Sequence, residues 1–143
     1  MTLFECTVRY DKTLDDGTNK KVTEAVIIDA QSFSEAEARA ISETSQLTRG
    51  EAEVLAIKRS SITEVHSAVD EAGSDKFFKA KIVYITIDEK TAKVKRQPAY
   101  ILVYAADIDK AHRAVVNIMQ TSVVDYEIAT LDETKFTFFY SHG

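Results

Sequence analysis

The chain has 143 residues, of which 29% are charged and 45% hydrophobic, and its formal net charge at pH 7 is −5. This composition is typical of a globular protein and excludes an intrinsically disordered chain. A negative net charge disfavours a general nucleic-acid coat protein, because such proteins bind mainly by neutralising phosphates. The apolar runs are too short to span a bilayer and no secretory signal is visible, so we expect a cytoplasmic protein.

Two halves of the sequence resemble each other. The matching segments are residues 3–10 with 77–84 and 53–57 with 127–131, at an offset of 74, and residues 27–30 with 102–105, at an offset of 75. Three matches in the same order predict an internal duplication, and repeated segments usually fold as copies of one supersecondary unit. We therefore predict a single domain, residues 1–143, built from two repeats at residues 3–68 and 77–140 and joined by a linker at residues 69–76.

The first repeat begins with alternating apolar and polar residues. Apolar side chains at every second position from Phe4 to Tyr10 predict a strand with one buried face. A turn follows at residues 11–20, and then a strand at residues 22–30 whose apolar run at 26–28 indicates burial on both faces.

A helix is predicted next, over residues 34–46. Ser34 and Glu37 fit a capping box at its start, and the apolar positions of the helix are Ala36, Ala40 and Ile41. A strand at residues 51–59 follows, and residues 61–66 form either a fourth strand or an extended edge of the first repeat.

The second repeat follows the same order. Strands are predicted at residues 77–87, 94–105, 126–131 and 135–140, and a helix capped by Asp109 carries an apolar stripe at Ala111, Ala114, Val115, Ile118 and Met119. Pro98 lies inside the second of these strands and cannot donate a ladder hydrogen bond. We therefore expect Pro98 at a sheet edge or a bulge.

These elements predict an α+β fold. Each repeat is a β-β-α-β unit with a further terminal strand, and the sheet is mostly antiparallel with two helices. The two repeats are expected to pack about a pseudo-twofold axis, either as one continuous sheet or as two sheets facing each other.

Several segments resemble an uncharacterised family found in gut bacteria of the Bacteroides type and in their phages and prophages. The resemblance is carried by residues 3–12, 22–30, 33–39, 77–90, 100–105 and 124–128, so it covers most of the chain. The family has no assigned activity, so no catalytic residue can be transferred. The resemblance implies a small intracellular protein encoded on mobile DNA, in the host cytoplasm if it is encoded by a phage.

The residues that usually carry chemistry are few. His66, His112 and His142 show no metal-ligand spacing, and Cys6 lies on the buried side of its strand, where cysteine acts as a small hydrophobic residue. The four glycines form no phosphate-binding loop, and the acidic turn at residues 11–16 lacks the pattern of a calcium loop. We therefore predict no enzyme, no cofactor and no metal site.

Basic residues on the predicted strands are the candidate binding residues. If neighbouring strands bring them together, Arg9, Lys79, Lys81, Lys95 and Arg96 would form a basic strip for nucleic acid or another anion. Tyr10, Tyr84 and Tyr100 lie on the same predicted strands and could stack on bases, although they fit the core rows better than the outer ones. The same lysines would also protect exposed strands from edge-to-edge association.

Two functions remain open. The first is a non-catalytic binding or assembly protein of phage or mobile-element type, which binds a protein or a small nucleotide-like ligand and acts in counter-defence. The second is a nucleic-acid-binding accessory protein that uses the basic strip. Four aromatic residues within residues 136–140 are too many for a single buried face, which favours a homodimer.

Overall fold

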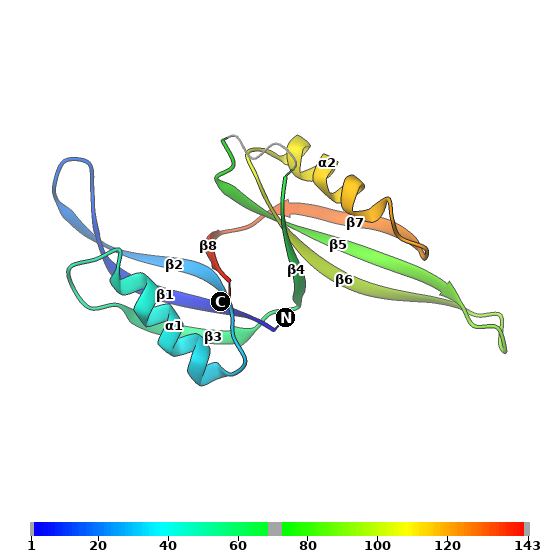
Figure 1. The fold of residues 1–143 in the computed structure, drawn as a ribbon, viewed down its shortest axis with the longest axis horizontal. Coiled ribbons are helices and arrows are strands. Elements are labelled where there is room, and N and C mark those ends of the chain that lie inside the picture. Colours follow the sequence, from blue (N-terminus) through cyan, green and yellow to red (C-terminus); the bar gives the residue numbers. More distant parts are fainter. Residues whose placement is uncertain (1, 69–72, 142–143) are drawn as a thin grey trace. The chain divides into compact units, whose positions relative to one another are not determined.

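The computed structural model describes residues 2–68 and 73–141. Residues 69–72 of the predicted linker, and His142, lie outside the described residues. The described residues form eight strands and two helices (Figure 1), in the order β1 (Leu3–Thr13), β2 (Asn19–Asp29), α1 (Phe33–Ser45), β3 (Glu53–Arg59), β4 (Ile62–Ser67), β5 (Lys76–Ile87), β6 (Val94–Ala105), α2 (Ile108–Met119), β7 (Asp125–Glu133) and β8 (Phe136–Tyr140).

The strands form two four-stranded sheets, with the orders β3-β1-β2-β8 and β4-β6-β5-β7. This arrangement confirms the α+β fold and excludes a single continuous sheet. The pairings of β1 with β2 and β3, and of β5 with β6 and β7, are antiparallel. The pairings of β8 with β2 and of β4 with β6 are parallel. The sheets are therefore mostly antiparallel, with one parallel pair at an edge of each.

The fourth strand of each predicted repeat belongs to the sheet of the other repeat. β4 follows β3 along the chain but pairs with β6, and β8 follows β7 but pairs with β2. The chain accordingly divides into unit 1, Met1–Ser60 with Lys135–Gly143, and unit 2, Ser61–Thr134. Unit 2 is therefore built from one continuous segment, whereas unit 1 needs the C-terminal segment to complete its sheet.

The chain leaves each sheet at an equivalent point. The Ser60 amide donates to the Leu3 carbonyl at 2.8 Å, and the Thr134 amide donates to the Phe77 carbonyl at 2.8 Å. These bonds close the last rung between β3 and β1 and between β7 and β5. Beyond them, a single residue separates each donor from the strand that enters the other sheet. The exchange of strands is thus fixed by short connections.

One helix covers one face of each sheet, which we call the helix face. In unit 1, Phe4, Cys6 and Val8 of β1 pack with Ala36 and Ala40 of α1. In unit 2, the corresponding core contains Phe78, Ala80 and Ile82 of β5 and Ala111, Ala114, Val115 and Met119 of α2. The alternating apolar residues that predicted these strands therefore lie on the side of each strand that packs against the helix.

Both helices begin earlier than predicted. Ser32 caps α1, where its side chain accepts a hydrogen bond from the Glu35 amide at 3.1 Å, so Ser34 is not the cap. Asp107 caps α2 and accepts from the Lys110 amide at 2.8 Å, so Asp109 lies in the first turn. In each case two suitable residues lie two positions apart, and the one whose backbone is still extended takes the cap. Neither described helix is long and apolar enough to cross a membrane.

The buried side of α1 is narrower than predicted. Ala36 and Ala40 are fully buried, but Ile41 remains 39% exposed and Thr44 takes the third buried position. On β2, Val26, Ile27 and Ile28 are all at most 1% exposed, so this strand is buried on both faces as the apolar run predicted.

Candidate functional site

The structure brings together only part of the predicted basic strip. The register of β5 and β6 pairs Lys79 with Leu102, Lys81 with Tyr100 and Arg96 with Ile85. Because paired residues share a face and faces alternate along a strand, Lys79, Lys81 and Arg96 lie on the face of unit 2 opposite its helix. Lys95 pairs with Thr86 and therefore lies on the helix face.

Two members of the strip are engaged by glutamates. Arg9 belongs to unit 1 and forms an ion pair with Glu53 at 2.8 Å, and Arg96 forms an ion pair with Glu127. The hydrogen bond from Arg9, and then its charge, lower the pKa of Glu53. Glu53 and Glu127 are separated by the sequence offset of 74. These arginines are thus paired within their own sheets, and neither is a free anion-binding group.

The tyrosines are placed unevenly. Tyr10 is 3% exposed and packs in the core of unit 1, and Tyr84 packs against the core of unit 2. Tyr100 lies on the opposite face, with the Lys79 ammonium 4.7 Å from its ring centroid. This cation–π contact already covers one side of the Tyr100 ring, so a base would have to displace Lys79 to stack there.

A cleft of about 150 Å³ lies on unit 1, which we call the unit 1 cleft. Thr7 of β1 lies at its centre, because its register partners are Ala25 of β2 and Ala56 of β3. The complete lining consists of Glu5, Cys6, Thr7, Ala25, Ala56, Ile57, Lys58, Lys135 and Phe136. Its floor is therefore the face of the sheet opposite α1, and the start of β8 forms one wall.

The polar side of the cleft carries both signs of charge. The Glu5 carboxylate accepts a hydrogen bond from the Ser60 hydroxyl at 2.8 Å and lies 3.6 Å from the Lys58 ammonium. Lys135 makes no ion pair, and the Thr7 hydroxyl no hydrogen bond, with any described residue. The cleft thus offers one uncommitted cation, one hydroxyl and one carboxylate beside the aromatic ring of Phe136.

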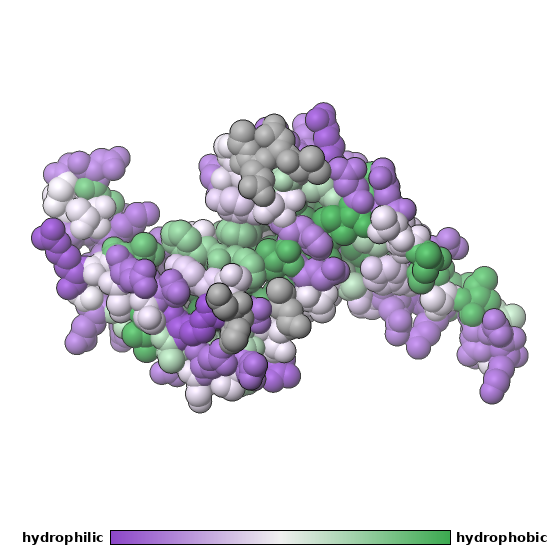
Figure 2. Space-filling model, viewed as in Figure 1, coloured by the Kyte–Doolittle hydropathy of each residue, from purple (hydrophilic) through white to green (hydrophobic). Residues whose placement is uncertain are grey.

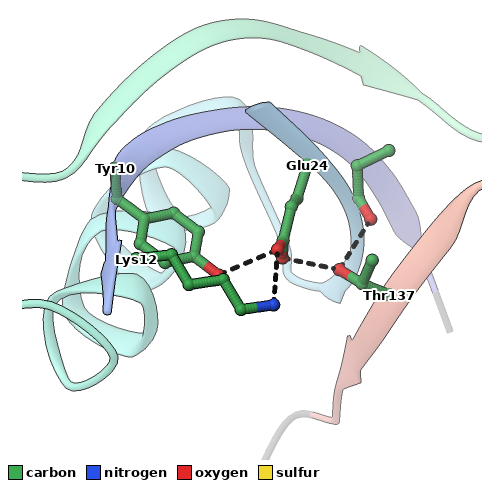
Figure 3. A network of polar contacts seen from close by, with 5 residues as sticks. Tyr10, Lys12, Glu24 and Thr137 are labelled. Carbon is green, nitrogen blue, oxygen red and sulfur yellow. Dashed lines mark hydrogen bonds and ion pairs between the residues drawn. The ribbon is translucent and has the colours of Figure 1, made fainter. Parts of the chain in front are cut away.

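The polar network that fixes β8 to unit 1 is shown in Figure 3. The Glu24 carboxylate accepts hydrogen bonds from the Tyr10 hydroxyl at 2.9 Å and the Thr137 hydroxyl at 3.1 Å, and Lys12 lies 3.9 Å from it. Burial, followed by the bond to Glu24 and its charge, raises the pKa of Tyr10. Since Thr137 follows Phe136 directly, this network positions the aromatic wall of the cleft.

Arg39 of α1 secures the other end of the same strand. Its guanidinium donates to the carbonyl of Asp29, where β2 ends, and to the carbonyl of Ser141 at 2.6 Å. One planar side chain therefore joins the helix to both neighbouring strands. The C-terminal strand is consequently held at both its beginning and its end.

The positions of unit 2 that correspond to the cleft residues carry different side chains. At the two sequence offsets, Ala25 corresponds to Tyr100, Glu5 to Lys79 and Lys58 to Asp132. The small side chain that leaves room in unit 1 is thus replaced by a large ring in unit 2, and the cross-strand charge pair is inverted. These cleft residues were not predicted as a site from the sequence. A search of the two repeats for equivalent positions with a small residue in one and a large residue in the other would have found Ala25.

The other chemical candidates are placed as follows. Cys6 is 1% exposed, and burial raises the pKa of its thiol to about 11. His66 lies 3.5 Å from Glu64, and His112 is exposed on α2. Among residues 2–68 and 73–141, no three histidine, cysteine, aspartate or glutamate side chains converge as a metal site. In the acidic turn, hydrogen bonds from Thr18 lower the pKa of Asp16.

Comparison with known proteins gives a family without an assigned function. No curated protein matches the chain. The family model described as a domain of unknown function, DUF4494, matches residues 2–142 and so spans both units. The chain therefore belongs to the DUF4494 family.

Proposed function

We propose that this protein is a non-catalytic binding protein whose partner is a small nucleotide-like ligand held in the unit 1 cleft. The observation that carries the proposal is the combination of Phe136, Lys58 and Lys135 around one hollow of about 150 Å³. An aromatic wall and nearby ammonium groups are what a planar ring joined to a phosphate requires.

The size of the cleft restricts how such a ligand is held. Cavities that enclose drug-sized molecules measure roughly 300–1,000 Å³, whereas a cavity of about 150 Å³ accepts a single aromatic ring. A nucleotide would therefore place one group inside and leave the remainder at the rim. Lys58 is 75% exposed along its side chain and lies 3.6 Å from Glu5, so a phosphate outside the cleft would share its ammonium group with that carboxylate.

The resemblance to proteins of Bacteroides-type bacteria and their phages supplies the biological context for this proposal. A protein that sequesters a signalling nucleotide in the host cytoplasm would act in counter-defence without catalysing a reaction. A homodimer is part of the proposal, because Phe138 remains 39% exposed on β8 beside Tyr140. Exposed aromatic side chains are favoured at protein interfaces.

Native mass spectrometry of the protein, purified from cells that express its normal neighbours, tests this function. We expect a retained mass of nucleotide size that is lost in the variant Lys58→Gln/Lys135→Gln. The matched control, Lys90→Gln/Lys93→Gln, removes two exposed lysines at the tip of the β5–β6 hairpin and should keep the ligand. Protein without any retained small molecule, but with a bound protein, would replace the proposal by a protein partner. The same spectra report the number of subunits.

The nucleic-acid alternative is favoured by one observation. Lys79 and Lys81 lie on one face of β5 beside Tyr100, so two cations and one aromatic ring share that face, as on surfaces that bind single strands. If this alternative holds, Lys79→Gln/Lys81→Gln should weaken binding of a single-stranded oligonucleotide at low salt, while Lys58→Gln/Lys135→Gln should not. Equal effects of both variants would indicate general electrostatic attraction and contradict it.

A further inference from the structure

We infer that the group inserted into the unit 1 cleft is a nitrogen heterocycle with an N–H donor, as in a nucleobase, and that the phosphate stays outside. The inference rests on the proposed function, since it names the part of the ligand that this site takes. It follows from the differences between the two units at equivalent positions.

The position of Tyr100 in unit 2 indicates where a ligand ring would lie in unit 1. In unit 2 the tyrosine ring extends from the register position opposite Lys81, on the face away from α2. Ala25 holds the same place in unit 1, opposite Thr7. The parallel edge strands pair in the same register there, with Ala25 beside Phe136 and Tyr100 beside Ile62. The strand pairing around the two positions is therefore alike, and at position 25 unit 1 has a methyl group where unit 2 has a tyrosine ring.

The charge next to this position differs between the two units, and the difference favours a ring over a phosphate in unit 1. In unit 2 the cation Lys79 lies against the ring of Tyr100, 4.7 Å from its centroid. The counterpart of Lys79 in unit 1 is the anion Glu5, whose side chain is only 17% exposed. An anion at that position disfavours an entering phosphate and favours a ring that presents N–H groups.

Glu5 has capacity for such a donor. A carboxylate offers about four acceptor positions, and Glu5 uses one for the Ser60 hydroxyl, with Lys58 nearby. The uncommitted Thr7 hydroxyl can donate to a ring nitrogen or accept from an amino group. Lys58 and Lys135 line the same cleft and are exposed, so the phosphate of the ligand would lie against them outside the cleft.

Calorimetric titration of the full chain with four probes separates ring from phosphate. The probes are adenosine, cytidine, ribose 5-phosphate and adenosine 5′-monophosphate. We expect the monophosphate to bind most tightly, at least one nucleoside to bind, and ribose 5-phosphate to bind weakest. Ala25→Tyr, which copies unit 2, should weaken nucleoside binding at least about tenfold, the loss expected when a ring is excluded from its site.

Thr23→Tyr is the matched control. Thr23 is exposed, lies two residues before Ala25 on the same face of β2, and does not line the cleft. The same ring added there should leave the affinity unchanged. A second variant, Glu5→Gln, keeps the shape of the side chain and its acceptor for Ser60, and should weaken nucleoside binding about tenfold, the value of one charged hydrogen bond. This variant keeps the test decisive if Ala25→Tyr fails to fold.

The outcomes distinguish this inference from the proposed function. If ribose 5-phosphate binds as tightly as the monophosphate and neither nucleoside binds, the cleft takes the phosphate; the inference is then overturned while the binding function stands. If none of the four probes binds and native mass spectrometry finds no retained small molecule, both are overturned. Nucleoside binding that survives Ala25→Tyr and Glu5→Gln places the ring elsewhere and also overturns the inference.

Discussion

Thr137 holds the same place in one sheet that Thr63 holds in the other. The Thr137 hydroxyl shares its one proton between Glu24, at 3.1 Å, and the Ala25 carbonyl, at 3.4 Å, and the Thr63 hydroxyl donates to the Tyr100 carbonyl at 3.3 Å. Each threonine is the extra residue at a register shift where the exchanged strand meets its partner. A bulge with a hydroxyl directed at the neighbouring carbonyl compensates for the ladder bond that the bulge removes.

The strand exchange predicts which fragments fold. Residues 61–134 contain all of unit 2, including β4, whereas the repeat at residues 77–140 lacks β4 and carries β8, which belongs to unit 1. We expect the 61–134 fragment to unfold cooperatively on heating in circular dichroism and the 77–140 fragment to show a lower and broader transition. Removal of β4 would leave the bonding groups of β6 from Tyr100 to Tyr104 unpaired. Equal stability of the two fragments would contradict this assignment of β4.

The network around Glu24 predicts a pH dependence. Burial and the bond to Glu24 raise the pKa of Tyr10 above its unfolded value of about 10. Stability from this group is therefore complete below about pH 10 and is lost as the pH rises toward the folded pKa. Tyr10→Phe should cost about 1–2 kcal/mol at pH 8 through the lost hydrogen bond to a charged acceptor, and should flatten the fall in melting temperature above pH 10.

Thr137→Val is the control for this experiment. It removes the other hydroxyl that donates to Glu24 but introduces no change in a titrating group. We expect it to lower the melting temperature without altering the slope with pH. An unchanged slope in Tyr10→Phe as well would show that other groups, and not Tyr10, control alkaline unfolding.

The local pattern of each repeat was sufficient to predict its elements. The buried residues of β1 and β5 alternate as the sequence indicated, and both helices present their alanines to the sheet. Period-2 and helical patterns report which side of an element is buried, so they succeed wherever one face meets a helix. The exchange of β4 and β8 could not be read in this way. Residues 62–67 and 136–140 are short strands, and their pattern of apolar residues does not determine which strand they pair with.

The candidate site was less predictable than the fold. The five basic residues were grouped because they lie on strands that were expected to be neighbours, but Lys95 lies one position out of phase with Arg96 and so faces the helix side. Arg9 is in the other unit, where Glu53 binds it. The unit 1 cleft combines β1, β2, β3 and the start of β8, and only the parallel pairing of β8 with β2 brings Phe136 beside Ala25.

The burial of Cys6 predicts an unreactive thiol. Cys6 is 1% exposed, and burial raises its pKa to about 11, so little thiolate is present at neutral pH. Reaction with a disulfide reagent at pH 8 should be slower in the native protein than in urea by roughly a hundredfold or more, because it requires opening of the core. Cys6→Ala copies Ala80 of unit 2 and should cost about 1 kcal/mol. Rapid labelling of the native protein would contradict the packing of β1 against α1.

Pro98 lies where β6 has a strand on one side only. β4 begins to pair at Tyr100, so the preceding half of β6 is open on that side. The Asp88 amide donates to the Lys93 carbonyl at 2.9 Å, and bonding directions alternate along a strand. Positions 94, 96 and 98 therefore point away from β5, and proline removes an amide that would otherwise face the open edge.

This edge adjoins exposed apolar side chains. Ile87 and Val94 pair near the end of the β5–β6 hairpin and are 67% and 62% exposed. Figure 2 shows apolar surface at this arm next to its hydrophilic tip. An open strand edge beside apolar surface is a site of intermolecular pairing, which proline opposes.

Pro98→Thr, which copies Thr23 of unit 1, should therefore increase association. The added amide donor completes the open edge of β6, so we expect light scattering to rise faster than in the unaltered protein during incubation a few degrees below the melting temperature. Gln97→Thr is the control, because its amide is directed toward β5 and the edge remains interrupted by proline. Equal scattering by Pro98→Thr and Gln97→Thr would show that this edge is protected by something other than the proline.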